Sequence, residues 1–157
     1  MWRSYKLTLT VSRVSSARFG GANVIFSVTN YWERLFRSDC REAAERAGVS
    51  CRKYAYDVEY AQGKHILNAA AKTVETLDAN GFLVSTLSHA GKCSNGMFQE
   101  PYHFDAKADM FPVYVSERYS ELAGKMGCVQ TARSWYCCVS ARASLVITHS
   151  RLSQAIS

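Results

Sequence analysis

The hydrophobic pattern begins with a short apolar run over residues 22–29 that is rich in β-branched side chains and carries no charge. This composition is typical of a buried strand. An amphipathic helix is predicted over 30–47, because apolar side chains recur there every three or four positions and charged side chains fill the other face. Thr29 or Asn30 can cap its first turn. Gly48 follows its last turn, where a glycine in the left-handed conformation can end the helix.

Residues 49–60 allow two interpretations. From Tyr54 to Tyr60, tyrosine or valine at every second position alternates with alanine, aspartate and glutamate, and this period of two favours a strand. Gly63 supports the strand, since a glycine weakens a continuous helix. The alternative is one long helix over 50–79, which would make the protein mostly α with a helical hairpin at 30–79.

A further amphipathic helix is predicted from Gly63 to 79, and an apolar strand over 82–87. Residues 22–88 then have the order strand, helix, strand, helix, strand. This order implies parallel strands joined by right-handed crossovers, with helices covering the sheet. The predicted fold class is therefore α/β (or α+β), with a βαβαβ-like core at 22–88.

The remainder of the chain has a weaker pattern. Residues 89–111 are predicted to form a long loop, because glycine, asparagine and proline interrupt them repeatedly. Pro112 can begin a third helix, which ends at Gly127. The C-terminal part contains two apolar runs, 135–139 and 145–148, which are interpreted as strands or a short helix. We expect 22–157 to form a single globular domain, since the length suits one core.

Residues 1–21 have the composition of a mitochondrial targeting leader, which is rich in Arg and Ser and poor in acidic residues. The first acidic residue of the chain is Glu33. The leader, which is either cleaved or retained, carries four basic residues: Arg3, Lys6, Arg13 and Arg18. The other interpretation is a basic tail without an addressing role.

The charge distribution argues against nucleic acid as the main partner. The net charge is +6, but the leader carries most of this excess, so the rest of the chain is close to neutral. A surface that neutralises many phosphates would be far more basic. No stretch of 18 apolar residues runs without a charge, which argues against a membrane-spanning helix. A peripheral membrane contact is compatible with this pattern.

The chain's six cysteines are interpreted mainly as buried reduced thiols, because most of them lie within apolar patterns. His89, Cys93 and His103 are candidate metal ligands, since histidine and cysteine bind zinc. The closely spaced cysteine pair of common zinc sites is missing. We therefore assign no metal and predict no cofactor.

No catalytic motif is present, since the chain lacks a nucleophile elbow, a phosphate loop and a dinucleotide fingerprint. Parallel sheets bind ligands beyond the carboxyl ends of their strands. That edge would display Thr29, Asn30, Asp57 and the segment 85–89, so a small stand-alone α/β enzyme stays among the alternatives. No catalytic residue is assigned, and the sequence favours a protein that is not an enzyme.

Aromatic side chains concentrate in the predicted loop, where docking on a partner or folding back over the core would explain them equally well. The candidate partner-binding residues are the four basic residues of the leader together with Phe98, Tyr102, Phe104 and Phe111.

These features favour an accessory or structural subunit of a mitochondrial inner-membrane assembly, either a respiratory complex or ATP synthase. It would bind other protein subunits and lie on the matrix side or against the inner membrane. The first alternative is a mitochondrial ribosomal protein, in which the basic leader would be an uncleaved arm that contacts RNA phosphates. The second is the small enzyme described above.

Overall fold

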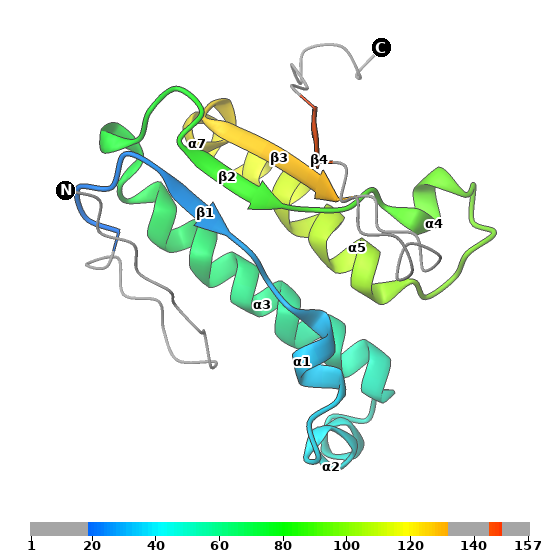
Figure 1. The fold of residues 1–157 in the computed structure, drawn as a ribbon. Coiled ribbons are helices and arrows are strands. Elements are labelled where there is room, and N and C mark those ends of the chain that lie inside the picture. The colour runs from blue at the N-terminus through cyan, green and yellow to red at the C-terminus, as the bar shows by residue number, and fades with distance from the viewer. Residues whose placement is uncertain (1–18, 132–144, 149–157) are drawn as a thin grey trace.

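The fold is that of a single α/β domain whose parallel strands are interleaved with helices, which confirms the predicted class. The computed structural model describes residues 19–131 and 145–148. Three strands run parallel, β1 (Ile25–Ser27), β2 (Phe82–Ser85) and β3 (Met126–Thr131), and their order in the sheet follows the chain (Figure 1). β4 (Leu145–Thr148) pairs antiparallel with β3, so the second apolar run of the tail is a strand. The first run, 135–139, lies outside the described residues.

The connection from β1 to β2 is helical almost throughout. It contains α1 (Tyr31–Leu35), α2 (Cys40–Arg46), α3 (Cys51–Ala71) and the short helix η2 (Val74–Thr76). Asn30 caps α1 as predicted, accepting hydrogen bonds from the backbone N–H groups of Trp32 and Glu33. The single helix predicted over 30–47 is wrong at its centre, because the chain breaks between α1 and α2. The Asp39 carboxylate lies at this break and accepts hydrogen bonds from Arg34 and Arg37.

The strand predicted at Tyr54–Tyr60 is wrong, and the helical alternative holds for this stretch. α3 runs unbroken through Gly63. The alternation was misleading, because this stretch also has buried positions at helical spacing. Ala55, Glu59, Gly63 and Ile66 lie three or four positions apart and are all buried. The βαβαβ order is therefore present, but it extends over 25–131 rather than 22–88.

The connection from β2 to β3 is also more helical than predicted. It contains α4 (Ala90–Cys93), α5 (Tyr102–Ala108), η3 (Asp109–Tyr114), α6 (Val115–Arg118) and α7 (Ser120–Gly124). The long loop predicted over 89–111 is thus wrong in its second half. Pro112 does not begin a helix but lies inside the π-helical segment η3, a wider turn that suits a residue lacking a backbone N–H. Gly127 belongs to β3 rather than to a helix end.

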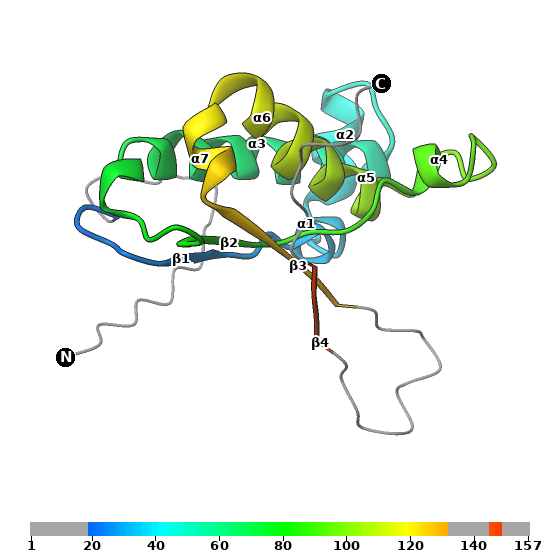
Figure 2. The same cartoon turned by 90° about the horizontal axis from the view of Figure 1, so that it is seen from above.

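The helices lie on one face of the parallel sheet. Figure 2 shows α3, α5, α6 and α7 on the same side of the strands. Right-handed crossovers explain this arrangement, because the chain moves across the sheet in one direction, from β1 to β3. Side chains from the strands and from these helices fill the core between the two layers, including Ile25, Leu67, Phe82, Val84, Phe111, Val115 and Leu122.

The other face of the sheet carries no helix among the described residues. Val24, Phe26 and Val28 point to this side and are 48%, 60% and 55% exposed, whereas Ile25 and Ser27 point into the core. The prediction of a buried strand is therefore correct for one face only. We call the row Val24, Phe26 and Val28 the outer row. No helix in the described part of the chain has the length and apolar character needed to cross a membrane.

Candidate functional site

A buried polar network lies where the parallel strands end. Lys107 of α5 donates from Nζ to the Thr29 carbonyl oxygen at 2.6 Å, to Thr29 Oγ1 at 2.8 Å and to Glu59 Oε1 at 2.8 Å. The Thr29 hydroxyl in turn donates to Glu59 Oε1 at 2.7 Å. Thr86, just beyond β2, donates to the Lys107 carbonyl oxygen at 3.3 Å. The network therefore joins both strand ends to α3 and α5.

This network is shielded from water, since only 1% of the Glu59 surface is exposed. Burying a charge is costly unless an opposite charge and hydrogen bonds compensate it. Lys107 meets that condition, because its three partners use its three N–H groups. A Lys107 amine bound in this way has no donor left for a ligand. The chemistry of this cluster is that of a structural clamp between β1, α3 and α5.

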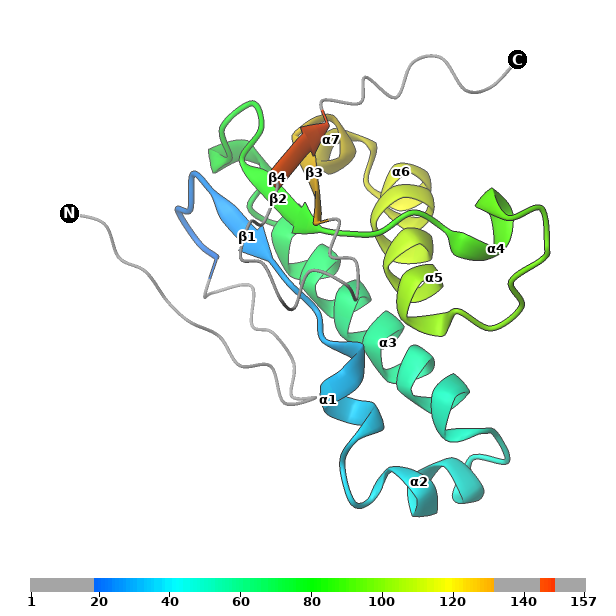
Figure 3. The ribbon, with the colours of Figure 1, turned by 45° about the vertical axis from the view of Figure 1, so that its right-hand side comes forward.

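A second polar cluster links α4 to α5, which lies alongside α3 (Figure 3). His89 caps α4, and its ring nitrogens lie 3.0 Å from Asp105 Oδ1 and 3.4 Å from Asp109 Oδ1. Asp105 Oδ1 also accepts from the backbone N–H of Ala90 at 2.9 Å. Tyr56 of α3 donates to Asp109 Oδ2 at 2.8 Å. Burial, followed by this hydrogen bond, raises the pKa of Tyr56 well above its ordinary value.

The candidate metal ligands do not converge. His89 is bound within the cluster above, and Cys93 is exposed at the end of α4. His103 lies on α5, where its ring is tilted by 46° against that of Trp32, with the ring centroids 5.0 Å apart. Within residues 19–131 and 145–148, no group of three or more His, Cys, Asp or Glu side chains is placed to hold a metal ion.

The sheet edge at the carboxyl ends of the strands, where the sequence predicts polar side chains for a ligand, is only partly present. Thr29 lies beyond β1 but takes part in the Lys107 network, and Asn30 is committed to capping α1. Asp57 does not lie at a strand end, because the strand predicted there is part of α3, where Asp57 forms an exposed ion pair with Lys53. Sequence reasoning missed Glu59 and Lys107, whose assigned elements were both wrong. The signal that could have identified Glu59 was its position, as a charged residue, on the buried stripe of a helix.

The aromatic candidates for partner binding are divided by the structure. Phe98 and the neighbouring Met97 are exposed, whereas Phe111 is fully buried in the core and is not accessible to a partner. Tyr102 and Phe104 are half-buried on α5, and Tyr102 packs edge-on against Tyr56. The basic candidates Arg3, Lys6, Arg13 and Arg18 lie outside the described residues.

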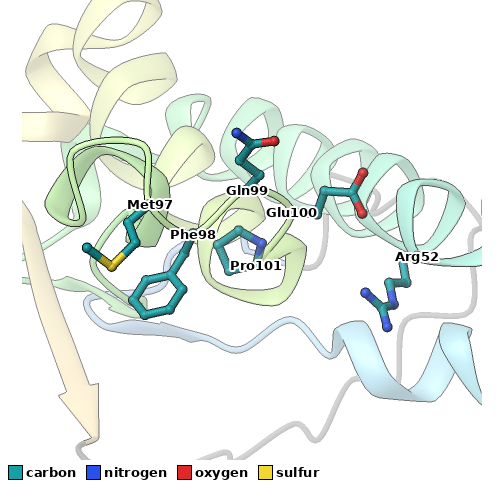
Figure 4. Close-up of a pocket in the computed structure, with 6 residues that line it drawn as sticks. All are labelled: Arg52, Met97, Phe98, Gln99, Glu100 and Pro101. Carbon is teal, nitrogen blue, oxygen red and sulfur yellow. The ribbon is translucent and has the colours of Figure 1, made fainter.

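Phe98 and Met97 border an open cleft of about 420 Å³, together with Gln99, Glu100, Pro101 and Arg52 of α3. Figure 4 shows the Phe98 and Met97 side chains on the loop and the Arg52 guanidinium on the far side of the cleft. None of these residues belongs to the segment 85–89, which the sequence places at the ligand-binding edge of the small-enzyme alternative. No protein-family model, curated protein or solved structure matches the chain.

The stability of the fold is expected to depend on His103 at mildly acidic pH. Burial lowers the pKa of His103 from its ordinary 6.5, outweighing the nearby Glu59 and Asp105 carboxylates. The unfolded chain therefore binds this proton more readily, so stability is complete above about pH 6.5 and decreases as the pH falls from there toward the folded-state pKa. We expect urea midpoints to fall more steeply between pH 7.5 and 5 in the wild type than in His103→Phe. Parallel pH profiles would contradict this expectation.

The thiols are expected to differ in reactivity. Cys40 is buried as predicted, and burial followed by the neighbouring Cys51 raises the pKa of its thiol. Cys93 is exposed, so the expectation of a buried thiol is wrong there. Because thiolates are the reactive species, an aromatic disulfide reagent should modify native Cys93 at least about tenfold faster than Cys40. Peptide mass spectrometry measures both rates, with Cys93→Ser as the control, and equal rates would show that the fold opens around Cys40.

Proposed function

We propose that this chain is a non-catalytic accessory subunit of a mitochondrial inner-membrane assembly, a respiratory complex or ATP synthase. It docks there through the uncovered face of its sheet. The observation that carries the proposal is the outer row, in which Phe26 of β1 and the flanking residues Val24 and Val28 are apolar and about half exposed. Parallel sheets are normally covered on both faces, and no helix of residues 19–131 covers this one, which favours a protein partner.

Two further observations support a binding role over a catalytic one. Thr29, Glu59 and Lys107 bond to one another near the end of β1, and Lys107 has no free donor. Additional large apolar side chains are exposed elsewhere on the described surface, namely Trp32, Phe36, Met97 and Phe98. Exposed apolar patches of this kind mark interaction surfaces. The mitochondrial localisation in this proposal is inferred from the composition of residues 1–21.

The test is native fractionation of mitochondria, followed by mass spectrometry of peptides from this chain. We expect co-migration with a respiratory complex or ATP synthase that resists RNase treatment. An RNase-sensitive shift together with ribosomal proteins would replace the proposal with the ribosomal alternative. Migration alone near 17.5 kDa would contradict both assemblies.

A matched pair of variants connects that result to the sheet. Phe26→Asp places a charge on the uncovered face, whereas Val113→Asp places the same charge at an exposed apolar position on η3. Both positions are exposed, so neither change opens the core. We expect Phe26→Asp to reduce the assembly-bound fraction about tenfold, corresponding to about 1.4 kcal/mol of binding free energy, and Val113→Asp to leave it unchanged. Equal effects would exclude this face as the docking surface.

A further inference from the structure

Among the described residues, the edge of β1 that faces away from β2 presents backbone hydrogen-bonding groups with no partner strand. The Asn23 carbonyl accepts from Asp78 at 2.9 Å, and the Ile25 N–H donates to Gly81 at 2.7 Å, both on the side of β2. Successive residues of a strand direct these groups to opposite sides. The N–H and C=O groups of the outer row, Val24, Phe26 and Val28, therefore point away from β2. Within the described sheet, β1 has a neighbouring strand on one side only.

This edge lacks the charged residues and prolines that commonly prevent strand pairing, although β1 itself is short, with three residues. Natural edge strands carry lysines, prolines or inward-pointing charges that block the approach of another strand. Residues 19–32 contain no charged residue and no proline. The side chains of the outer row are two valines and a phenylalanine, which have high strand propensity. An edge with this composition is suited to pairing.

We propose that two copies of this chain pair through β1, antiparallel, about a two-fold axis that passes beside Phe26. The outer row reads the same in both directions, with Phe26 at its centre and a valine two residues away on each side. Phe26 then lies opposite Phe26 of the second copy, and Val24 lies opposite Val28 of the second copy. Their free N–H and C=O groups exchange hydrogen bonds reciprocally, and every opposed pair of side chains is apolar.

The symmetry selects a second copy as the occupant of the edge. A two-fold interface uses the same patch on both subunits, and a palindromic row satisfies this requirement without a mismatched pair. A slip of one residue would direct bonding groups of one strand back toward β2 and turn its apolar row to the other face. A one-residue slip is therefore excluded, and among the registers that keep these backbone groups facing each other, this one alone places every residue of the outer row opposite another residue of the outer row. The pairing leaves both outer rows side by side on the uncovered face, so it goes beyond the proposed docking and does not depend on it.

The oligomeric state of the purified full-length chain tests the pairing by light scattering after size exclusion. We expect twice the 17.5 kDa chain mass for the wild type and for Val24→Ala, which retains the N–H at this position. Val24→Pro removes that N–H, and proline is tolerated where an edge strand faces solvent. We expect its dimer dissociation constant to rise at least about tenfold. A monomeric wild type, or an unchanged Val24→Pro dimer, would overturn the proposal.

Cysteine cross-linking tests the register, in a Cys93→Ser background that removes the thiol found exposed among the described cysteines. Opposed Cα atoms of a hydrogen-bonded antiparallel pair lie about 5.5 Å apart, a separation that a disulfide can span. Phe26→Cys should give a covalent dimer on mild oxidation, with the bond mapped to position 26 by mass spectrometry. Val24→Cys faces position 28 of the second copy and should not bond to itself. Bonding at position 24 but not at 26 would refute this register.

Circular dichroism of each variant separates loss of pairing from loss of folding, since we expect Val24→Pro to weaken the dimer while the chain stays folded. The fractionation experiment gives an independent result. A dimer that does not co-migrate with an assembly would leave the pairing intact and refute only the proposed function. Co-migration of a chain that is monomeric when purified would support the proposed function and refute only the pairing.

Discussion

Lys107→Ala is expected to lower the free energy of unfolding by about 3–5 kcal/mol, the usual cost of breaking a buried ion pair from one side. The substitution leaves the Glu59 carboxylate in the interior with the Thr29 hydroxyl as its remaining donor. It also removes the hydrogen bond to the Thr29 carbonyl, which lies just beyond β1. We therefore expect the urea midpoint of unfolding to fall sharply.

Two further variants identify the origin of that loss. Lys107→Met combined with Glu59→Leu removes both charges and keeps most of the volume, so it should recover most of the stability. Lys53→Ala breaks the exposed ion pair with Asp57 on α3 and should change stability by less than about 1 kcal/mol. If Lys107→Ala cost no more than Lys53→Ala, the network would not act as the clamp described above.

The sequence predicts those parts of the fold that depend on local pattern. The β-branched run at 22–29 contains β1, the run at 82–87 contains β2, and Asn30 caps α1 as its side chain suggests. Such features are short-range, since they arise from side-chain shape and from hydrogen bonds to nearby backbone. The α/β class follows because apolar strands and amphipathic helices alternate along the chain.

The stretch at Tyr54–Tyr60 was misassigned because two periodicities coincide there. Tyrosines at every second position resemble a strand, yet Tyr56 and Tyr60 are also four apart and stack on one side of α3 at 6.0 Å. Tertiary contacts select between the two patterns, since the helix buries Ala55, Glu59 and Gly63 against other elements. Contacts of this kind are not visible in a local sequence window.

The polar network and the outer row were missed for related reasons. Glu59 was assigned to a strand and Lys107 to a loop, so nothing placed them together across 48 positions of sequence. The outer row was included in a buried strand, since an apolar run on both faces normally indicates burial. Only the three-dimensional arrangement, with α3, α5, α6 and α7 on one side of the sheet, shows that the other face of this strand is exposed.

Gly63→Ala is expected to destabilise the protein by about 1–3 kcal/mol, the usual cost of overpacking a core. In an isolated helix the same change would stabilise by about 1 kcal/mol. The opposite sign is expected because a Cβ at position 63 would overlap Met110 Sδ and lie 2.9 Å from Met110 Cε. Met110 is completely buried, so its side chain has little room to move. The glycine thus allows η3 to approach α3 closely.

A double-mutant cycle measured by urea denaturation separates the stabilisation from helix propensity from the cost of overpacking. Met110→Ala alone should cost about 2–5 kcal/mol through the cavity it leaves, but it also removes the obstacle to a Cβ at position 63. In that background, Gly63→Ala should therefore become stabilising by about 1 kcal/mol, the helix-propensity term alone. Gly124→Ala serves as the control, because a Cβ at this position of α7 would meet nothing within 4 Å. A stabilising effect of Gly63→Ala in the wild-type background would show that α3 and η3 are not held at this distance.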